Sequence, residues 1–245
     1  MKLLVLISLF LTLFARSAPA ERSYEYDYGY EPRPPVPFPS EYRDYQILPG
    51  TTSPDQRYAF IYPKRSLLFE LQKYGLFLAA LNPFHILSRV PTGYSALAEM
   101  ARSYYAAGWS KDSSTTVFVA GGKWGPDKVW VLKLRNGKIV KKAELTAAVR
   151  RQVLPDFKKS HATGYNDYFD FIFDDDHEDI SGWGLDDSGH VMIDTVCTTD
   201  PKELEPHRWA VHFQGIWDVA SGKFLESSFT HIPPRHSHDA TASSR

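Results

Sequence analysis

The sequence predicts a mainly β protein made of antiparallel meanders, with one helix inserted between the second and the third. Three observations lead to this prediction. A polar turn centred on an aspartate precedes an apolar strand at three places, a hairpin signal follows each strand, and one later segment has helical periodicity instead. Because one sheet-forming unit recurs, the repetition indicates the architecture before any single residue suggests a chemistry.

The three turns and their strands cover residues 53–62, 109–120 and 183–196. In each copy a polar turn with an aspartate runs into a short apolar stretch. We expect Asp55, Asp112 and Asp187 to accept hydrogen bonds from backbone N–H groups of their own turns. The recurrence of these aspartates then has a structural explanation and requires no catalytic role.

The second halves of the copies also correspond. Residues 131–140 align with residues 216–225, and both contain a glycine turn, at Asn136-Gly137 and Ser221-Gly222. These dipeptides supply the positive backbone angle that a two-residue hairpin needs. The first copy has a weaker version in residues 81–87, where proline replaces the flexible turn residue. Each copy is therefore predicted to form a small antiparallel meander.

A turn of the Trp-Ser-x-Asp type, the strand after it and a strand ending in x-Gly-Lys resemble blades of TolB-like and WD40-like β-propellers. The same phrases resemble those of a group of uncharacterised secreted bacterial proteins, over about residues 49–231. The resemblance implies blade-like meanders in three propeller-like repeats. Closed propellers have about four to eight blades, so an array of three unevenly spaced copies is expected to be open or distorted. Ordinary sheets with blade-like hairpins are the alternative.

The inserted helix is predicted over residues 143–157. Leu145, Val149 and Val153 recur on one face at helical intervals, and Pro155 is expected to end the helix. Residues 65–81 stay open between a helix and two strands, because residues 76–81 read equally well as a buried strand.

The N-terminus predicts a secretory signal peptide over residues 1–20. Lys2 supplies the positive charge, residues 3–14 are apolar, and Ala18-Pro19-Ala20 fits the small-x-small rule for cleavage after Ala20. The apolar run is shorter than the about twenty residues that span a bilayer. We therefore expect a secreted or periplasmic protein with no stable membrane insertion after signal cleavage.

Three further regions are predicted behind the signal peptide. Residues 21–46 alternate tyrosine with acidic residues and then become proline-rich, which is typical of a disordered tether. The alternative is that the tyrosine segment adds a strand to a sheet edge. Residues 47–231 are the β-rich, propeller-like domain, and residues 232–245 are a polar, histidine-containing tail that is expected to be disordered.

Composition narrows the classes of function. The formal net charge is −1 and no basic run stands out, so nucleic acid is not an expected partner. Cys197 is the only cysteine of the chain, which excludes an intrachain disulfide. It lies in an apolar run, and we expect a buried, unreactive thiol.

The acidic run of residues 174–179 is the candidate metal site. Asp174, Asp176 and Glu178 offer the oxygen ligands that calcium prefers, although their spacing does not match an EF-hand loop. The alternative is a solvated turn that ends an aromatic strand. No other cofactor is expected.

Among the six tryptophans, Trp124 is the candidate for ligand binding, because it lies in a glycine-rich loop and has no counterpart in the other copies. Trp109 and Trp183 occupy equivalent places before the turns, and Trp130 and Trp217 lie in equivalent strands. Recurrence at equivalent positions favours packing for these four residues.

No recognisable catalytic motif is present: a closing glycine is missing from the one partial nucleophile elbow, at residues 93–97. The sequence therefore favours a non-enzymatic binding or interaction module of the cell envelope, with an envelope protein or a glycan as partner. The alternatives are a secreted hydrolase whose site is assembled from separate blades, a calcium-stabilised structural protein, and an oligomer in which two incomplete arrays complete one another.

Overall fold

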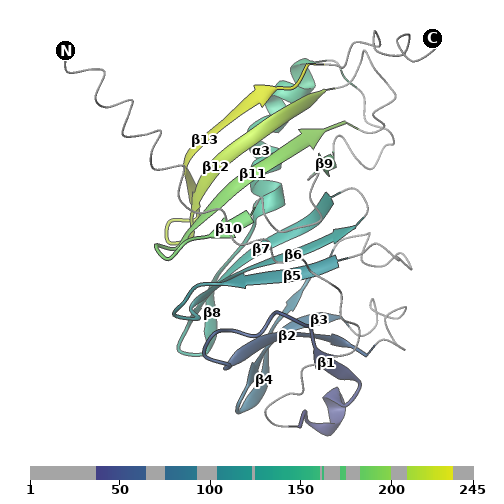
Figure 1. The fold of residues 1–245 in the computed structure, drawn as a ribbon, viewed down its shortest axis with the longest axis vertical. Helices are drawn as coiled ribbons and strands as arrows, with labels where there is room; N and C mark the ends of the chain where they lie inside the picture. Colours follow the sequence, from purple (N-terminus) through teal and green to yellow (C-terminus); the bar gives the residue numbers. More distant parts are fainter. Residues whose placement is uncertain are drawn as a thin grey trace, which may run out of the picture. The chain divides into compact units, whose positions relative to one another are not determined.

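The structure is a computed structural model that describes residues 37–64, 75–92, 104–122, 125–160, 162, 172–174, 183–199 and 209–233. Within these residues the strands form three antiparallel sheets, each containing a four-stranded meander in chain order (Figure 1). No strand pairing joins one sheet to another in the described part of the chain. The mainly β fold with open, blade-like meanders and one inserted helix is therefore confirmed.

The bounds of the strands follow the three predicted copies. The first sheet consists of β1 (Tyr45–Ile47), β2 (Tyr58–Pro63), β3 (Leu76–Leu81) and β4 (Phe84–Val90). The second consists of β5 (Tyr104–Trp109), β6 (Thr115–Gly122), β7 (Gly125–Arg135) and β8 (Lys138–Glu144). The third consists of β10 (Trp183–Leu185), β11 (His190–Thr198), β12 (Ala210–Asp218) and β13 (Lys223–His231), and β9 (Ile172–Asp174) also pairs with β11. Residues 76–81 are thus a strand.

An equivalent backbone hydrogen bond is found in each of the three sheets, which indicates that the sheets are copies of one unit. In each, the carbonyl oxygen of the residue before the second strand accepts a bond from a residue at the end of the third strand. The donor and acceptor pairs are Leu81 and Arg57 at 2.8 Å, Leu134 and Ser114 at 2.7 Å, and Val219 and Gly189 at 3.1 Å. Such recurrence in the backbone shows that the repeat is structural as well as compositional.

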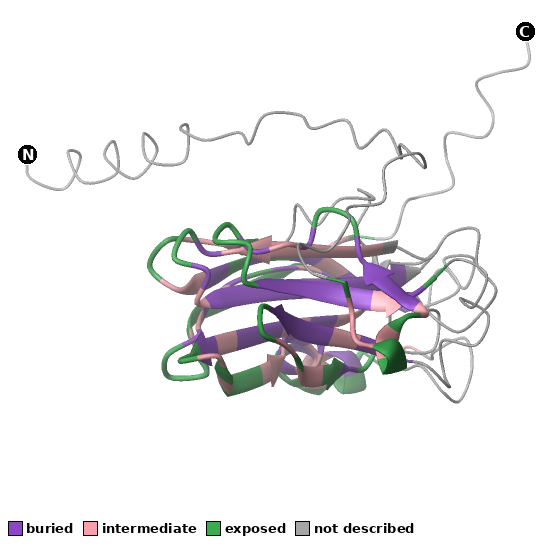
Figure 2. Cartoon of the chain, turned by 90° about the horizontal axis from the view of Figure 1, so that it is seen from below, coloured by how far each residue is buried: buried purple, intermediate pink, exposed green. Residues whose placement is uncertain are grey.

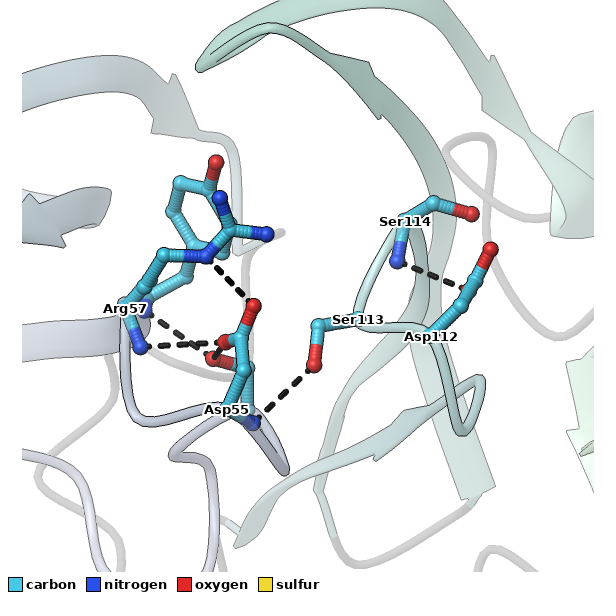
Figure 3. Close-up of polar contacts among 7 residues, drawn as sticks. Asp55, Arg57, Asp112, Ser113 and Ser114 are labelled. Atoms are coloured by element: carbon cyan, nitrogen blue, oxygen red, sulfur yellow. Dashed lines mark hydrogen bonds and ion pairs between the residues drawn. The ribbon is translucent and has the colours of Figure 1, made fainter.

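The first two turns are built alike. In the second turn the Ser110 hydroxyl donates to Asp112 Oδ1 at 2.6 Å and accepts from the Thr115 N–H at 3.0 Å. Asp112 Oδ1 also accepts from the Ser114 N–H at 3.0 Å (Figure 3). Ser53 and Asp55 make the same contacts in the first turn, at 2.7, 3.0 and 3.0 Å. The predicted turn role of Asp55 and Asp112 is therefore confirmed.

The third turn differs from the prediction. Its capping carboxylate is Asp186, which accepts from the N–H groups of Ser188 and His190, both at 2.8 Å. The turn is one residue shorter, so a single carboxylate at the first position replaces both the serine and the aspartate of the other turns. Asp187 instead pairs with Lys111 of the second turn. The expectation that Asp187 caps its own turn was wrong.

The glycine hairpins are of two kinds. Asn136 and Gly137 have φ of 51° and 71° and join Arg135 to Lys138 as a two-residue turn, as predicted. The loop at Ser221-Gly222 has four residues, 219–222, because Asp218 pairs directly with Lys223. The Asp218 carboxylate accepts from two N–H groups of this loop, at 2.8 and 2.9 Å, which stabilises the longer connection. The two-residue prediction was wrong there.

Consecutive sheets pack face to face through apolar residues. The first sheet contributes Tyr58, Phe60 and Leu78 to a cluster with Phe118 and Leu132 of the second. The rings of Phe60 and Phe118 are stacked with centroids 4.4 Å apart. The strands between the mostly exposed turns are largely buried, as Figure 2 shows. The apolar residues that join one sheet to the next are therefore part of the hydrophobic core.

The helix α3 (Leu145–Lys159) lies in the cluster between the second and third sheets, where Leu145, Val149 and Val153 are fully buried. Pro155 lies inside this helix, so the predicted end at Pro155 was wrong. The last turn persists because it is held from the third sheet. Trp209 Nε1 donates to Asp156 Oδ2 at 2.8 Å, and the Trp209 ring packs edge-on against Phe157 at 5.5 Å.

The third sheet has one face unlike the others. Equivalent residues of the second strands β2, β6 and β11 show the difference. Two positions after the first residue of the strand stand Phe60, Val117 and Met192, respectively. Four positions after it stand Tyr62, Val119 and Asp194. In the first two sheets these side chains pack against the next sheet. In the third, Met192 is 42 % exposed, and Asp194 accepts from Gln214 Nε2 at 3.1 Å and pairs with His212. A polar outer face is typical of a terminal repeat.

The folded domain begins earlier than predicted. Phe38 and Tyr42 pack against Phe84 with ring centroids 5.0 and 5.1 Å apart, and β1 starts at Tyr45. These aromatic contacts place residues 37–46 with the first sheet, so the predicted tether boundary at residue 46 was too late. The predicted signal peptide, residues 21–36 and residues 234–245 lie outside the described residues. β13 ends at His231, next to the predicted end of the domain.

We expect replacement of Asp112 by alanine to lower the free energy of unfolding by about 1 kcal/mol at neutral pH, the usual size of a lost side-chain cap. Hydrogen bonds from Ser110 and Ser114 lower the Asp112 pKa from 3.8 to about 2. Because the folded pKa is depressed, this stabilisation is present above pH 4 and disappears as the pH falls toward 2. Urea unfolding at pH 7, 4 and 2 measures the difference.

The control for this variant is Asp187→Ala, at the position that sequence alignment equates with Asp112. Among the described residues, the Asp187 side chain makes an exposed ion pair with Lys111 and no other ion pair or hydrogen bond, so its removal is expected to change stability by less than about 0.5 kcal/mol. An equal effect of both variants would contradict the assignment of the cap to Asp112.

Candidate functional site

Most of the residues predicted to form a site lie outside the described part of the chain. This applies to Trp124, Asp176 and Glu178. Asp174 ends β9, where its backbone pairs with Val196, and its side chain is not among those described. The described residues contain no group of three or more His, Cys, Asp or Glu side chains that is arranged to hold a metal ion. The calcium prediction stays a prediction.

The tryptophans predicted to pack do so where their side chains are described. Trp109 Nε1 donates to the Thr51 carbonyl at 2.9 Å, and Trp130 Nε1 donates to the Pro91 carbonyl at 2.9 Å. Both bonds join the second sheet to residues of the first. Trp217 is buried in the third sheet, 6 % exposed, with its ring edge-on to Phe224 at 5.0 Å. The side chain of Trp183 is outside the described set.

The cysteine is also as predicted. Cys197 is fully buried in the cluster between the second and third sheets. Burial raises the pKa of the Cys197 thiol far above its usual value, because a thiolate is poorly solvated there. The residue is therefore not available as a nucleophile.

Two open grooves share Trp217 as a lining residue, and sequence reasoning did not identify them. The first has a volume of about 350 Å³ and is lined by Val140, Lys141 and Ala143 of β8 and by the loop after β12, which contributes Ser221 and Gly222. The second, of about 310 Å³, is lined by Arg151 and Gln152 of α3 and by Lys223 and Phe224 of β13. The site thus forms where the second sheet, the inserted helix and the third sheet come together.

A β-bulge shapes the first groove. The register of β7 and β8 shifts after Lys133, so Val140 has no partner on β7 and is 49 % exposed. Equivalent shifts leave Leu87 unpaired in β4 and Leu225 unpaired in β13. A bulge in an outer strand bends that strand and redirects its side chains. In the second sheet the bulge puts an apolar side chain beside Lys141.

Two neighbouring lysines on β8 have different roles. The Lys142 ammonium lies 4.6 Å above the Trp130 ring and donates to the Arg89 carbonyl at 3.1 Å, so it is directed toward the first sheet. Burial lowers the Lys142 pKa. Successive strand residues point to opposite faces, so Lys141 points to the other side. Lys141 is exposed and has no ion-pair partner in the described residues.

The grooves are electropositive and rich in hydrogen-bond donors. Their lining residues include the exposed cations Lys141, Arg151 and Lys223 and no carboxylate, whereas the ammonium of Lys142 is directed toward the first sheet. The Trp217 Nε1–H is buried and has no hydrogen-bond partner in the described part of the chain. A buried donor without a partner costs about 1–3 kcal/mol.

None of the family models, curated proteins and solved structures compared with this chain matches it. In the part of the chain that the structure describes, no helix combines the length and the apolar composition needed to cross a bilayer.

Proposed function

We propose that the protein is a non-enzymatic binding module of the cell envelope, secreted or periplasmic, that holds its ligand in the two grooves sharing Trp217. The single observation that carries this proposal is the convergence of exposed cationic side chains, which form no ion pair in the described residues, at open grooves between otherwise closely packed sheets. A concave surface with a few polar groups on a rigid scaffold is the usual form of a ligand site.

Several features support this proposal over a catalytic one. The lining residues include no carboxylate, histidine or cysteine, which are the usual general acids, bases and nucleophiles. The envelope location is supported by the signal-peptide pattern of residues 1–20, and the Tyr/Pro-rich segment behind it suits a tether to a partner.

Calorimetric titration of the mature chain, from Glu21 onward, against neutral and acidic oligosaccharides and peptides tests the proposal. A ligand of the grooves is expected to bind wild type and to raise its unfolding midpoint by mass action. Ser221→Tyr fills the first groove while keeping the Ser221 N–H that bonds to Asp218, and it should weaken binding at least tenfold by steric exclusion.

The matched control is Ser228→Tyr, the same change at an exposed position of β13 that lines neither groove. It should bind like wild type. Ligand binding that is unchanged by Ser221→Tyr would show that the binding site lies outside the first groove. Recovery of a cleaved ligand after incubation would show that the protein is a hydrolase and not a non-enzymatic binding module.

A further inference from the structure

The lining of the two grooves has a consistent chemical character. Lys141, Arg151 and Lys223 are exposed, and no ion pair is formed by any of them in the described residues. Other cations of the same sheets are paired, for example Lys128 with Glu144 at 2.5 Å and Arg57 with Asp55 at 2.5 Å. Asp218 lies opposite Lys223 in the β12–β13 ladder, but no ion pair forms between them, and cations without an ion pair are suited to an anionic partner.

The hydrogen-bonding groups in the lining agree with the charge. The ammonium and guanidinium groups can only donate, whereas Ser221 and Gln152 can donate and accept. A ligand rich in acceptor oxygens satisfies such a surface. The Trp217 indole N–H is covered by protein atoms, so it is not one of the groups that a ligand in the grooves contacts.

The arrangement of the cations suggests a polymer. They lie in two adjoining open grooves, with Lys141 in the first and Arg151 and Lys223 in the second. A single small anion occupies one groove, whereas a chain with repeated carboxylates reaches both. Hydroxyl and ring oxygens between the carboxylates supply further acceptors, and the exposed Val140 side chain offers an apolar contact to the C–H face of a sugar ring.

We infer that the ligand is a linear acidic polysaccharide, whose carboxylates pair with Lys141, Arg151 and Lys223. This inference rests on the proposed binding function and specifies the ligand class of the same site. The sugar contact needs no stacking on Trp217, because that side chain is only 6 % exposed.

The probe is an oligogalacturonate of defined length, titrated into the mature chain by calorimetry at 50 mM and 200 mM salt. We expect binding that weakens at the higher salt concentration, because exposed ion pairs are screened. Lys141→Gln and Arg151→Gln should each weaken binding about three- to tenfold. The control, Lys159→Gln, removes an exposed cation from the last turn of α3 that lines neither groove, and it should bind like wild type.

A second variant separates ligand binding from folding. Trp217→Phe keeps an aromatic ring against Phe224 but removes the unpartnered N–H. It should leave the unfolding midpoint of the free protein unchanged or higher. It should bind oligogalacturonate like wild type, because the N–H is covered. Loss of binding in this variant would contradict a site made of the exposed cations alone.

Comparison ligands distinguish failure of the inference from failure of the proposed function. Neutral dextran oligosaccharides should not bind, and polyglutamate should bind at least tenfold more weakly than the uronate. Equal binding of polyglutamate would show that the ligand class is acidic polymers in general and not acidic polysaccharides. Binding of a neutral glycan or a peptide that is lost in Ser221→Tyr, without uronate binding, would overturn the inference and preserve the binding module. If no probe shows binding that is lost in Ser221→Tyr, then both the proposed binding function and the inferred ligand class are wrong.

Discussion

Replacing Phe118 with alanine is expected to lower the free energy of unfolding by about 3–5 kcal/mol, the range for removing a fully buried aromatic side chain. Phe118 has no exposed surface, and its ring stacks on Phe60 at 4.4 Å and on Tyr105 at 6.3 Å. The change therefore removes the central contact between the first and second sheets and leaves a cavity there. Urea unfolding followed by tryptophan fluorescence measures the loss.

The appropriate control is Val140→Ala in the same sheet. Val140 is 49 % exposed at the bulge in β8, so its truncation should cost less than about 1 kcal/mol. If Phe118→Ala were as mild as this control, the sheets would not depend on their packing for stability, and the face-to-face arrangement would be wrong.

Replacing Trp209 with alanine is the second change with a large expected effect, again about 3–5 kcal/mol. Trp209 is 2 % exposed and holds the last turn of α3 through Asp156 and Phe157. Loss of this contact should release the residues around Pro155, since proline contributes no N–H to the helix. Hydrogen exchange of the α3 amides should rise most at residues 156–159.

A more conservative change tests the hydrogen bond alone. Trp209→Phe keeps a ring against Phe157 but leaves Asp156 without its indole donor, so a smaller loss of about 1–3 kcal/mol is expected. Equal losses for Trp209→Ala and Trp209→Phe would assign the whole effect to the hydrogen bond. Unchanged exchange at the end of α3 in both variants would show that this turn is stable without Trp209.

The repeat could be predicted from the sequence because its signals are local. A serine and an aspartate two residues apart bond to one another and to the adjacent backbone, so Asp55 and Asp112 were assigned correctly. The third turn was assigned to the wrong aspartate, because two aspartates stand side by side and only the length of the turn decides between them. Asp186 reaches the His190 N–H in the shorter turn, and Asp187 does not.

Features that depend on distant segments were not predictable. The helix continues past Pro155 because Trp209, far along the chain, holds Asp156. The grooves arise where β8, α3 and the loop after β12 meet, and nothing local to Lys141 or Ser221 indicates that they face the same space. The unpartnered N–H of Trp217 is likewise a property of the packed core. The sequence indicated correctly that Trp217 packs, but it did not indicate that the indole N–H would lack a partner in the described residues.

The polar outer face of the third sheet differs in its packing properties from the corresponding faces of the first two sheets. In a closed ring, the number of repeats is set by geometry, since the last unit must meet the first. Here Asp194 and His212 occupy a surface that in the preceding sheets is apolar, so a further unit would have to desolvate them. The side chains of this one sheet therefore disfavour the packing of a further sheet on that face, and no closure of the array into a ring is needed for this effect.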